Sequence, residues 1–324
     1  MEIATFETLY TDGIVSLWNE EAVKEDYKEL DRASFDLIFL SNPYFDKENT
    51  FVLLASDRVV GFACGCTGDD LPLGDVAGYI TCIVIASAHR SDRTFRMLLQ
   101  ALEARFRSKG KKQADVLFFN PMMLPWYIPD TPKHEHNNAP GVPVGAPLHS
   151  FLRSEGYADR AIENAMYLHL AGFSIPDEIR AKEEKIRTDG YEVALFDSGK
   201  HTGLGEMLTG LNNELWTREI TRCAAKGVPV VIAVRAGEAA GFAGPVIRQD
   251  NGRGYFAGIG VHPDHEGHGL GSILFFKLCE AFKNIGTEYM SLYTGVKNPA
   301  KGIYEKAGFR TVKQFAIMRK ELER

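Results

Sequence analysis

Residues 258–272 read GIGVHPDHEGHGLGS and form the most informative stretch of the chain. The pattern indicates a short apolar strand, a Pro-Asp turn and three glycines that open a helix. The glycines, Gly267, Gly269 and Gly271, are spaced by two residues, so the backbone there can approach a ligand closely. The start of a helix also supplies unpaired N–H groups with a partial positive charge. A pyrophosphate fits such a place.

This stretch matches neither of the two best-known phosphate loops. No Gly-Lys-Ser/Thr closes it, as a P-loop requires, and the surrounding pattern lacks the alternating parallel strands and the later acid of a dinucleotide site. Nucleotide hydrolysis and hydride transfer are therefore both disfavoured. A glycine-rich turn alone is also compatible with a tight turn that binds nothing, so the context has to decide.

The order of features in the first half of the chain recurs in the second half. The pair Gly61-Phe62 corresponds to Gly241-Phe242, and SFLRSEGY (residues 150–157) corresponds to GIYEKAGF (residues 302–309). Each half predicts a strand, one or two helices, three strands, a long helix, a strand, a short helix and a last strand. The sequence therefore predicts a mixed α/β unit that is present twice.

Two interruptions set the expected domain bounds. Residues 120–150 contain seven prolines and a polar KHEHNN run, which indicates an irregular surface loop inserted into the first copy. Apolar alternation stops after Leu170, and the charged stretch that follows is typical of a short helical connector. We therefore predict a first domain at 1–170, a linker at 171–190 and a second domain at 191–324.

Composition limits the classes of protein. The chain has 324 residues, of which 45% are hydrophobic and 25% charged, and this length suits two globular domains. The net charge of −6 repels phosphate backbones and anionic lipids, so neither nucleic acid nor membrane is an expected partner. Five cysteines, an odd number in a long chain, suit free thiols in a reducing compartment. With a start that is acidic and unlike a signal peptide, we expect a cytoplasmic protein.

The glycine loop and the repeated order of elements resemble the GNAT superfamily of acyl-CoA-dependent N-acyltransferases, here as a tandem pair. The family loop reads Gln/Arg-x-x-Gly-x-Gly/Ala, and residues 266–271 read EGHGLG, so that Gly269 and Gly271 match. Glu266 departs from the family, and a carboxylate beside a pyrophosphate is unfavourable unless it points away. The closing segment is also similar, since it has the family's residues at Asn298, Ala300, Tyr304, Gly308 and Phe309.

The resemblance implies an α/β fold of two GNAT-like mixed-sheet domains in tandem, joined by a short helical linker, with acetyl-CoA as the cofactor. In the family the pantetheine arm lies between two splayed strands. By resemblance, a backbone N–H, that of Val261, polarises the thioester carbonyl, and Tyr304 protonates the leaving thiolate. The residues implied to contact the cofactor are Ile259, Gly260, Val261, Glu266, Gly267, His268, Gly269, Leu270, Gly271, Ser272, Asn298 and Ala300.

The group that deprotonates the amine stays unassigned at this point. Family members often use a strand carboxylate for this step, but the strand GYFAGIGV has no acid. Glu214, Glu219, His262 and water are the alternatives. Trp216 and Tyr293 either shape an acceptor pocket or pack in the core.

The first copy lacks the glycines of the loop. Residues 90–95 read RSDRTF at the equivalent place, and Phe95 is expected to occupy the space that phosphates need. The arginine side chains Arg90, Arg93 and Arg96 are the remaining groups able to hold an anion. Phe151 or Leu152 stands where the second copy has Tyr304, so no hydroxyl is offered. We expect this half to act as a scaffold or as one wall of an acceptor site.

The insertion in the first copy carries aromatic and titratable residues that suit a lid. These are Trp126, Tyr127, His134, Glu135 and His136. Two histidines on a polar loop without further ligands do not make a metal site, and none is expected.

The sequence thus predicts an enzyme that transfers acetyl from acetyl-CoA to an amine of a small molecule. A CoA-responsive binding or regulatory protein without turnover and a protein or peptide N-acetyltransferase are the alternatives. The identity of the acceptor and the oligomeric state are not determined by the sequence.

Overall fold

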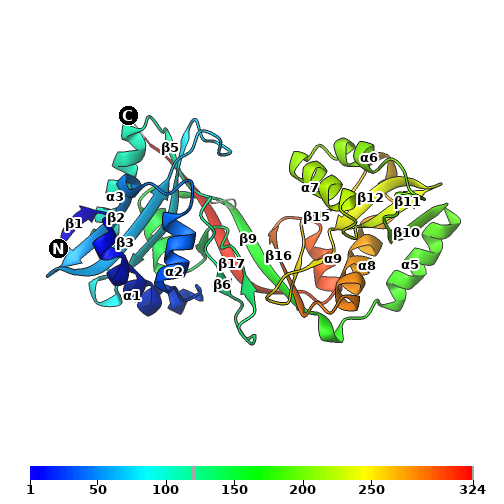
Figure 1. Cartoon of the computed structure of the whole chain (residues 1–324), viewed down its shortest axis with the longest axis horizontal. Helices are drawn as coiled ribbons and strands as arrows, with labels where there is room; N and C mark the ends of the chain where they lie inside the picture. The colour runs from blue at the N-terminus through cyan, green and yellow to red at the C-terminus, as the bar shows by residue number, and fades with distance from the viewer. Residues whose placement is uncertain (118–120, 323–324) are drawn as a thin grey trace. The chain divides into compact units, whose positions relative to one another are not determined.

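The computed structural model describes residues 1–117 and 121–322, and the chain divides into two compact units. Unit 1 consists of residues 1–165 together with the C-terminal segment that begins at Val312, and unit 2 consists of Met166–Thr311. Figure 1 shows the red C-terminal strand within the unit that the blue and cyan elements form. No helix in the described ranges has the length and apolar character needed to cross a membrane.

Unit 1 is built on one sheet, in the order β1-β2-β3-β4-β5-β17-β9. The first four strands are antiparallel neighbours, β5 runs parallel to β4, and β17 runs antiparallel to β5. The strands are β1 (Glu2–Thr5), β2 (Thr50–Ala55), β3 (Arg58–Cys66), β4 (Ala77–Ile85), β5 (Gln113–Val116), β9 (Ala158–His169) and β17 (Arg310–Glu321).

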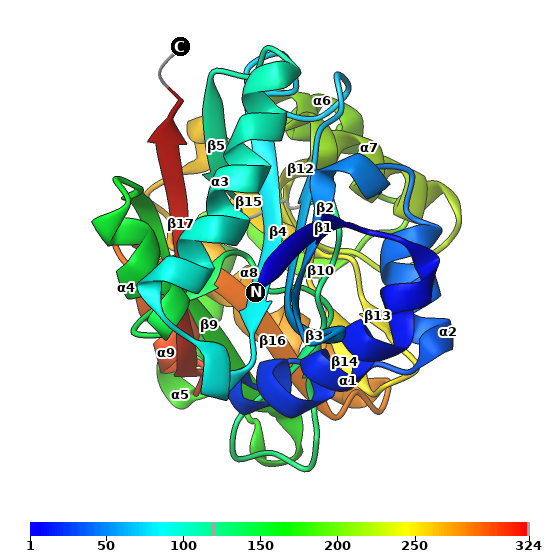
Figure 2. The same cartoon turned by 90° about the vertical axis from the view of Figure 1, so that its left-hand side faces the viewer.

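Helices cover both faces of this sheet and bury an apolar cluster on each. The helices are α1 (Thr11–Glu21), α2 (Arg32–Phe35), α3 (Asp92–Ser108) and α4 (Pro147–Ser154). Figure 2 shows α3 lying across the strands β4 and β5. Its leucines and Phe106 form one cluster with the inward residues of the sheet, whereas α1 and α2 pack into the other. The apolar positions of α3 recur at helical spacing, which explains why it buries one face.

The proline-rich insertion is packed rather than solvated, which differs from the expectation of an irregular surface loop. It contains three two-residue strands, β6 (Trp126–Tyr127), β7 (Glu135–His136) and β8 (Val142–Pro143). β6 pairs with β7, and β8 pairs with β17. Trp126, His134 and His136 are buried, and the ring of Trp126 packs on Phe315 of β17 and stacks on His136. Asn120, the first residue of the predicted insertion, lies outside the described residues.

Unit 2 has its strands in two sets. One set has the order β10-β11-β12-β15. In the other set, the end of β9 is followed by β16, then β14, then β13. The strands are β10 (Tyr191–Leu195), β11 (Val231–Arg235), β12 (Glu238–Gly244), β13 (Ile247–Arg248), β14 (Arg253–Tyr255), β15 (Gly258–Val261) and β16 (Tyr289–Gly295).

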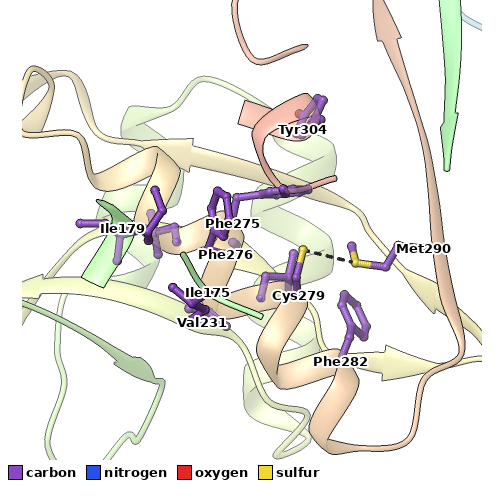
Figure 3. Packing of buried hydrophobic residues seen from close by; sticks show 14 of the residues in the cluster. Ile175, Ile179, Val231, Phe275, Phe276, Cys279, Phe282, Met290 and Tyr304 are labelled. Atoms are coloured by element: carbon purple, nitrogen blue, oxygen red, sulfur yellow. Dashed lines mark hydrogen bonds between the residues drawn. The ribbon is translucent and has the colours of Figure 1, made fainter. Parts of the chain in front are cut away.

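The long helix α8 (Leu270–Asn284) fills the main core of unit 2 (Figure 3). Its residues Phe275, Phe276, Cys279 and Phe282 are all buried, and Cys279 Sγ lies 3.7 Å from Met290 Sδ of β16. The other helices are α5 (Asp177–Thr188), α6 (Leu204–Gly210), α7 (Glu214–Ala225) and α9 (Lys301–Lys306). A smaller apolar cluster under α6 and α7 covers the opposite face.

The last strand of each sequence half contributes to the core of the other half's unit. Met318 of β17 is fully buried in the cluster of α3, although it comes at the end of the second half. Met166 of β9 is fully buried in the cluster of α8, although it comes at the end of the first half. Arg319 of β17 also pairs with the buried Asp115 of β5 at 2.7 Å. The two copies therefore exchange their final strands within one chain.

This exchange makes the compact units differ from the predicted domains. The sequence places residues 312–324 with the second domain, whereas the structure places the described residues from Val312 in unit 1. The predicted linker, residues 171–190, contains the helix α5, and α5 packs in unit 2 through Ile179 and Ile186. Apolar alternation shows that a strand is present but does not say which of two similar sheets it joins.

A pair of matched substitutions tests the strand exchange. Met318→Ala and Met166→Ala each remove a fully buried side chain, which typically costs about 2–5 kcal/mol of unfolding free energy. Native-state hydrogen exchange should show that Met318→Ala lowers amide protection in β2 to β5, and that Met166→Ala lowers it in α8 and β16. Each substitution serves as the control for the other. Loss of protection in the sequence half that carries the substitution would contradict the exchange.

Candidate functional site

Two strands of unit 2 that follow each other in sequence take different partners. β14 pairs with β16 at Gly254 and Met290, whereas β15 pairs with β12. The turn between them, Phe256-Ala257, is where the two strands part. Ala257 and Gly258 both lie on the side of α7, since Ala257 belongs to the cluster under α7 and Gly258 contacts Trp216. This irregularity, like a β-bulge, redirects the chain and leaves one edge of β15 open.

The register of β15 determines which of its N–H groups face the open edge. His262 N donates to Ala240 O at 2.9 Å, so the residues at even positions, including Gly260, bond to β12. Ile259 and Val261 form the alternate pairs, in which N–H and C=O point away from the partner strand. Within the described residues, β15 has β12 as its only strand partner. The amides of Ile259 and Val261 are therefore free to pair with an extended ligand.

The glycine loop adopts the backbone conformation that only glycine takes easily. Gly267 has φ +82° and Gly269 has φ +75°, both in the left-handed region. Gly269 is the N-cap of α8, and no side chain caps this helix. The first N–H groups of α8 consequently lack a partner within the helix, and they point toward the loop.

The space in front of this helix fits a diphosphate. A Cβ atom at Gly267 or Gly269 would meet nothing within 4 Å, and one at Gly271 would first meet Ile303 and Val261 at 4.0 Å. Open space beside uncapped N–H groups is the arrangement that binds phosphate at helix starts. The residues present therefore fit the pyrophosphate of acetyl-CoA, with the open edge of β15 leading away from it.

The side chains of Glu266 and His268 lie at the surface, whereas those of Leu270 and Ser272 are covered to different extents. Glu266 is exposed, so its carboxylate need not face a bound phosphate. His268 is exposed as well, and its ring lies 4.9 Å from that of Tyr191, whose hydroxyl is 2.9 Å from His265 Nδ1. Leu270 is buried in the core and Ser272 is half-buried. Leu270 thus anchors the helix, and the cofactor contacts expected for residues 267–272 fall to the backbone.

Asn298 and Ala300 begin the helix that carries Tyr304. Asn298 Oδ1 accepts from Ala300 N at 2.9 Å, which holds the turn that precedes α9. Asn298 is exposed and Ala300 packs partly against the core. In this structure, Asn298 and Ala300 therefore position α9.

Tyr304 projects from α9 into the aromatic part of the core (Figure 3). Its ring centroid lies 4.8 Å from that of Phe275 and 6.4 Å from that of Phe256, beside the turn where β14 and β15 part. The side chain is 5% exposed, and in the described part of the chain its hydroxyl makes no hydrogen bond. Burial raises the pKa of Tyr304 to about 12, so the phenol keeps its proton at neutral pH.

The groups considered for proton removal lie on the opposite side of the sheet. Glu214 is exposed in the first turn of α7. His262 Nδ1 accepts from Asp264 N at 3.3 Å, and its ring lies against Gly210 of α6. Glu219 of α7 accepts a 2.8 Å hydrogen bond from the hydroxyl of Tyr255, a strand residue that the sequence did not single out for the site.

Trp216 and Leu211 cover β15 from the side of α6 and α7. Trp216 Nε1 donates to Ala257 O at 3.1 Å and so satisfies a carbonyl at the turn where the strands part. Its ring and the side chain of Leu211 lie so close to Gly258 and Gly260 that a Cβ atom there would come within 2.6 Å. The two strand glycines therefore let the helices rest directly on β15.

The equivalent loop of unit 1 is closed. Ser91 and Thr94 form a capping box at the start of α3, so side chains already satisfy N–H groups of that helix. The ring of Phe95, in the place of Gly271, stacks on Phe151 at 5.0 Å. This agrees with the expectation that Phe95 fills the space of the phosphates.

Two of the three arginines considered as anion ligands in unit 1 already form ion pairs with carboxylates. Arg90 pairs with the buried Glu21 at 2.9 Å, and Arg96 pairs with Glu155 at 2.6 Å. Arg93 is exposed. In the described residues, no three His, Cys, Asp or Glu side chains form a group that would hold a metal ion.

The chain belongs to the acetyltransferase (GNAT) family, whose sequence profile matches residues 11–127 and 204–309, more than half of the chain. It is therefore an acyltransferase of the GNAT type, present as two tandem mixed α/β copies. No curated protein matches the chain in sequence.

Solved structures of low sequence identity share the fold. A GCN5-related N-acetyltransferase from Sphaerobacter thermophilus is 14% identical, with a TM-score of 0.63 over 100% of this chain and 96% of its own. A tandem GNAT protein from the clavulanic acid biosynthesis pathway is 15% identical, with a TM-score of 0.56 over 100% and 99%. A glucosamine N-acetyltransferase region of a fungal multi-domain β-N-acetylglucosaminidase is 14% identical, with a TM-score of 0.66. This chain is covered to 98% in that comparison and spans 38% of the fungal chain.

A bulky residue at Gly271 tests the phosphate site. Gly271→Leu should raise the Kd for CoA at least about tenfold, because the side chain occupies the open space in front of the N–H groups. Isothermal calorimetry measures the Kd, and the melting temperature should stay close to that of the wild type. Gly205→Leu, at another open helix position, is the control. Equal CoA affinity in the Gly271 variant and the wild type would place the phosphates elsewhere.

Proposed function

We propose that the protein is an acetyl-CoA-dependent N-acetyltransferase that acts on an amine of a small molecule. One observation carries the proposal, namely the open edge of β15 that leads into the uncapped start of α8. The edge suits the amide groups of a pantetheine arm, and the helix start suits a diphosphate. Family membership supports the same cofactor.

Acetyl-CoA, when bound, supplies the activated acetyl thioester. The N–H groups of residues 267–272 would hold its diphosphate, and the free amides of Ile259 and Val261 would hold the arm or polarise the thioester carbonyl. For the carbonyl we propose the N–H of Ile259 in place of that of Val261, because Ile259 lies two residues nearer the turn at Phe256, toward which an arm that starts at the diphosphate runs. The N–H of Val261, next to Gly271, would then hold the arm. A donor fixed in the backbone stabilises negative charge on oxygen without reorganising.

Tyr304 is the proposed acid that protonates the sulfur as it leaves. Its position beside Phe256 and the protonated state of its phenol support this role. The surroundings are apolar, so a proton delivered from Tyr304 meets little competition from bulk water.

Three features support a small cationic acceptor. Trp216 and Leu211 lie directly on the strand glycines, which favours a compact molecule over a folded polypeptide at this place. The net charge of −6 attracts cations over long range. The fungal region of similar fold is described as a glucosamine N-acetyltransferase, and an amino sugar is one such acceptor.

The five cysteines are all free thiols and all buried, which supports the proposed cytoplasmic location.

A panel assay tests the function directly. Release of CoA thiol from acetyl-CoA should depend on added amine and should be faster with small amines than with peptides. Faster turnover of peptides would favour the protein or peptide transferase, and binding of acetyl-CoA without turnover of any amine would favour a regulatory protein.

Tyr304→Phe tests the acid. The phenyl ring keeps its packing on Phe275, so the Kd for acetyl-CoA should stay within about twofold, whereas kcat should fall by about 10²–10⁴. Because the pKa of Tyr304 is about 12, the wild-type kcat should not decline from loss of this proton below about pH 10. Tyr44→Phe, which removes a hydroxyl in unit 1, is the control. An unchanged kcat in Tyr304→Phe would remove Tyr304 from the mechanism.

A further inference from the structure

A carboxylate of a neighbouring helix is hydrogen-bonded to the strand that precedes β15. Tyr255 is the last residue of β14, and its hydroxyl donates to Glu219 Oε1 of α7 at 2.8 Å. Elsewhere in the described residues, no group donates a hydrogen bond to the other oxygen of Glu219. Glu219 is partly exposed, so a ligand can reach this carboxylate.

The pair lies at the end of the site where the acyl group arrives. The diphosphate site is at residues 267–272, beyond the C-terminal end of β15, so an arm that follows the open edge runs toward Gly258. Four strand residues span about 13 Å, which an extended pantetheine arm covers. Its reactive end therefore approaches the turn Phe256-Ala257, one residue from Tyr255.

Two proton-transferring groups then flank that turn from opposite faces. Tyr304 lies beside Phe256 on the side of α8. Glu219 lies beside Tyr255 on the side of α7, one helical turn after Trp216, which bonds to Ala257 O. The alternatives are less suited, since Glu214 lies in the exposed first turn of α7 and the ring of His262 packs against Gly210 beyond the far end of β15.

The surroundings of the pair keep the proton on the phenol of Tyr255. Burial, with the hydrogen bond and charge of Glu219, raises the pKa of Tyr255 above its usual value. Arg253 on β14 acts in the opposite direction, and Cys223 lies one turn further along α7. Arg222 and Lys226 are the other charged groups of α7 near Cys223, and Tyr289 and Tyr293 of β16 face Arg253. Tyr255 is consequently a donor that orients Glu219.

We propose that Glu219 is the catalytic base that removes a proton from the acceptor's ammonium group, and that Tyr255 is its positioning residue. The inference rests on the proposed function and deepens it, because it assigns the acceptor side of the same site. The acceptor is then a primary or secondary amine that carries a positive charge before it reacts.

The transfer balances with the groups named. Glu219 takes one proton from the ammonium nitrogen, whose lone pair forms the C–N bond to the acetyl carbon while the C–S bond breaks. Tyr304 gives its proton to the sulfur, and the second proton that the nitrogen loses returns to Tyr304 through water. Glu219 releases its proton to the solvent, so each turnover yields the amide, CoA thiol and one proton.

The test compares Glu219→Gln with Glu214→Gln on the same helix. At pH 7, Glu219→Gln should lower kcat/KM for the amine by about 10²–10⁴, and the Kd for acetyl-CoA measured by calorimetry should stay within about twofold. The loss should shrink toward pH 10, where an aliphatic amine with a pKa near that of lysine loses its proton unaided. Glu214→Gln should behave as the wild type does.

A spectroscopic readout separates positioning from mere packing. In Glu219→Gln, one tyrosine should ionise at lower pH in the absorbance titration, since the carboxylate no longer opposes the phenolate, and the additional change Tyr255→Phe should abolish this shift. Tyr255→Phe alone should lower kcat/KM less than Glu219→Gln does.

Unaltered kcat/KM in Glu219→Gln, in a wild type that turns over an amine, would overturn the assignment and leave the proposed function intact. A loss of the same size at pH 7 and pH 10 would also overturn it. Absence of turnover by the wild type with every amine would instead refute the proposed function and, with it, this inference.

Discussion

The site depends on one feature of the backbone, which is the change of strand partner at the turn Phe256-Ala257. Before this turn, β14 pairs with β16. From this turn on, β15 pairs with β12, and the amides of Ile259 and Val261 face an edge that no described strand covers. An unpaired strand edge is normally a liability, because it offers hydrogen bonds to any other chain. Here the edge is four residues long and ends in a helix start whose N–H groups are also unpaired.

Other features of unit 2 maintain this arrangement. Trp216 satisfies the carbonyl of Ala257, and the glycines of β15 let α6 and α7 lie close enough to hold the strand from one side. On the other side α8 fills the core with aromatic residues that also fix Tyr304. The chemistry is therefore placed on rigid elements, and the two faces of one strand turn can present an acid and a carboxylate separately.

Unit 1 has the same kind of sheet and helices as unit 2, but it lacks the glycines of the loop. Ser91 and Thr94 cap α3 with side chains, and Phe95 and Phe151 fill the space that stays open at Gly271. The arginines Arg90 and Arg96 form ion pairs with Glu21 and Glu155. Side chains at a few positions thus occupy, at the start of α3, the space that unit 2 leaves open at the start of α8. The sheet and its exchanged final strand are present in both units.

The sequence predicted the fold class and the tandem family membership because Gly269, Gly271 and Tyr304 stand at the spacings of the family's loop and closing segment. It did not predict the exchange of β9 and β17, since both strands have the apolar alternation that either sheet accepts. It also missed the burial of His134 and His136, because proline and polar runs are typical of loops whether or not they pack. Tyr255 was overlooked for the site because its partner Glu219 is 36 residues away, and only the folded chain brings them together.

Amide hydrogen exchange of the intact chain, with and without acetyl-CoA, probes the open edge of β15 itself. We predict slower exchange at the amides of Ile259 and Val261 and at residues 267–272, because a bound arm and diphosphate would take up these donors. Protection of the start of α3 in unit 1 instead, or no change along β15, would contradict the proposed cofactor site.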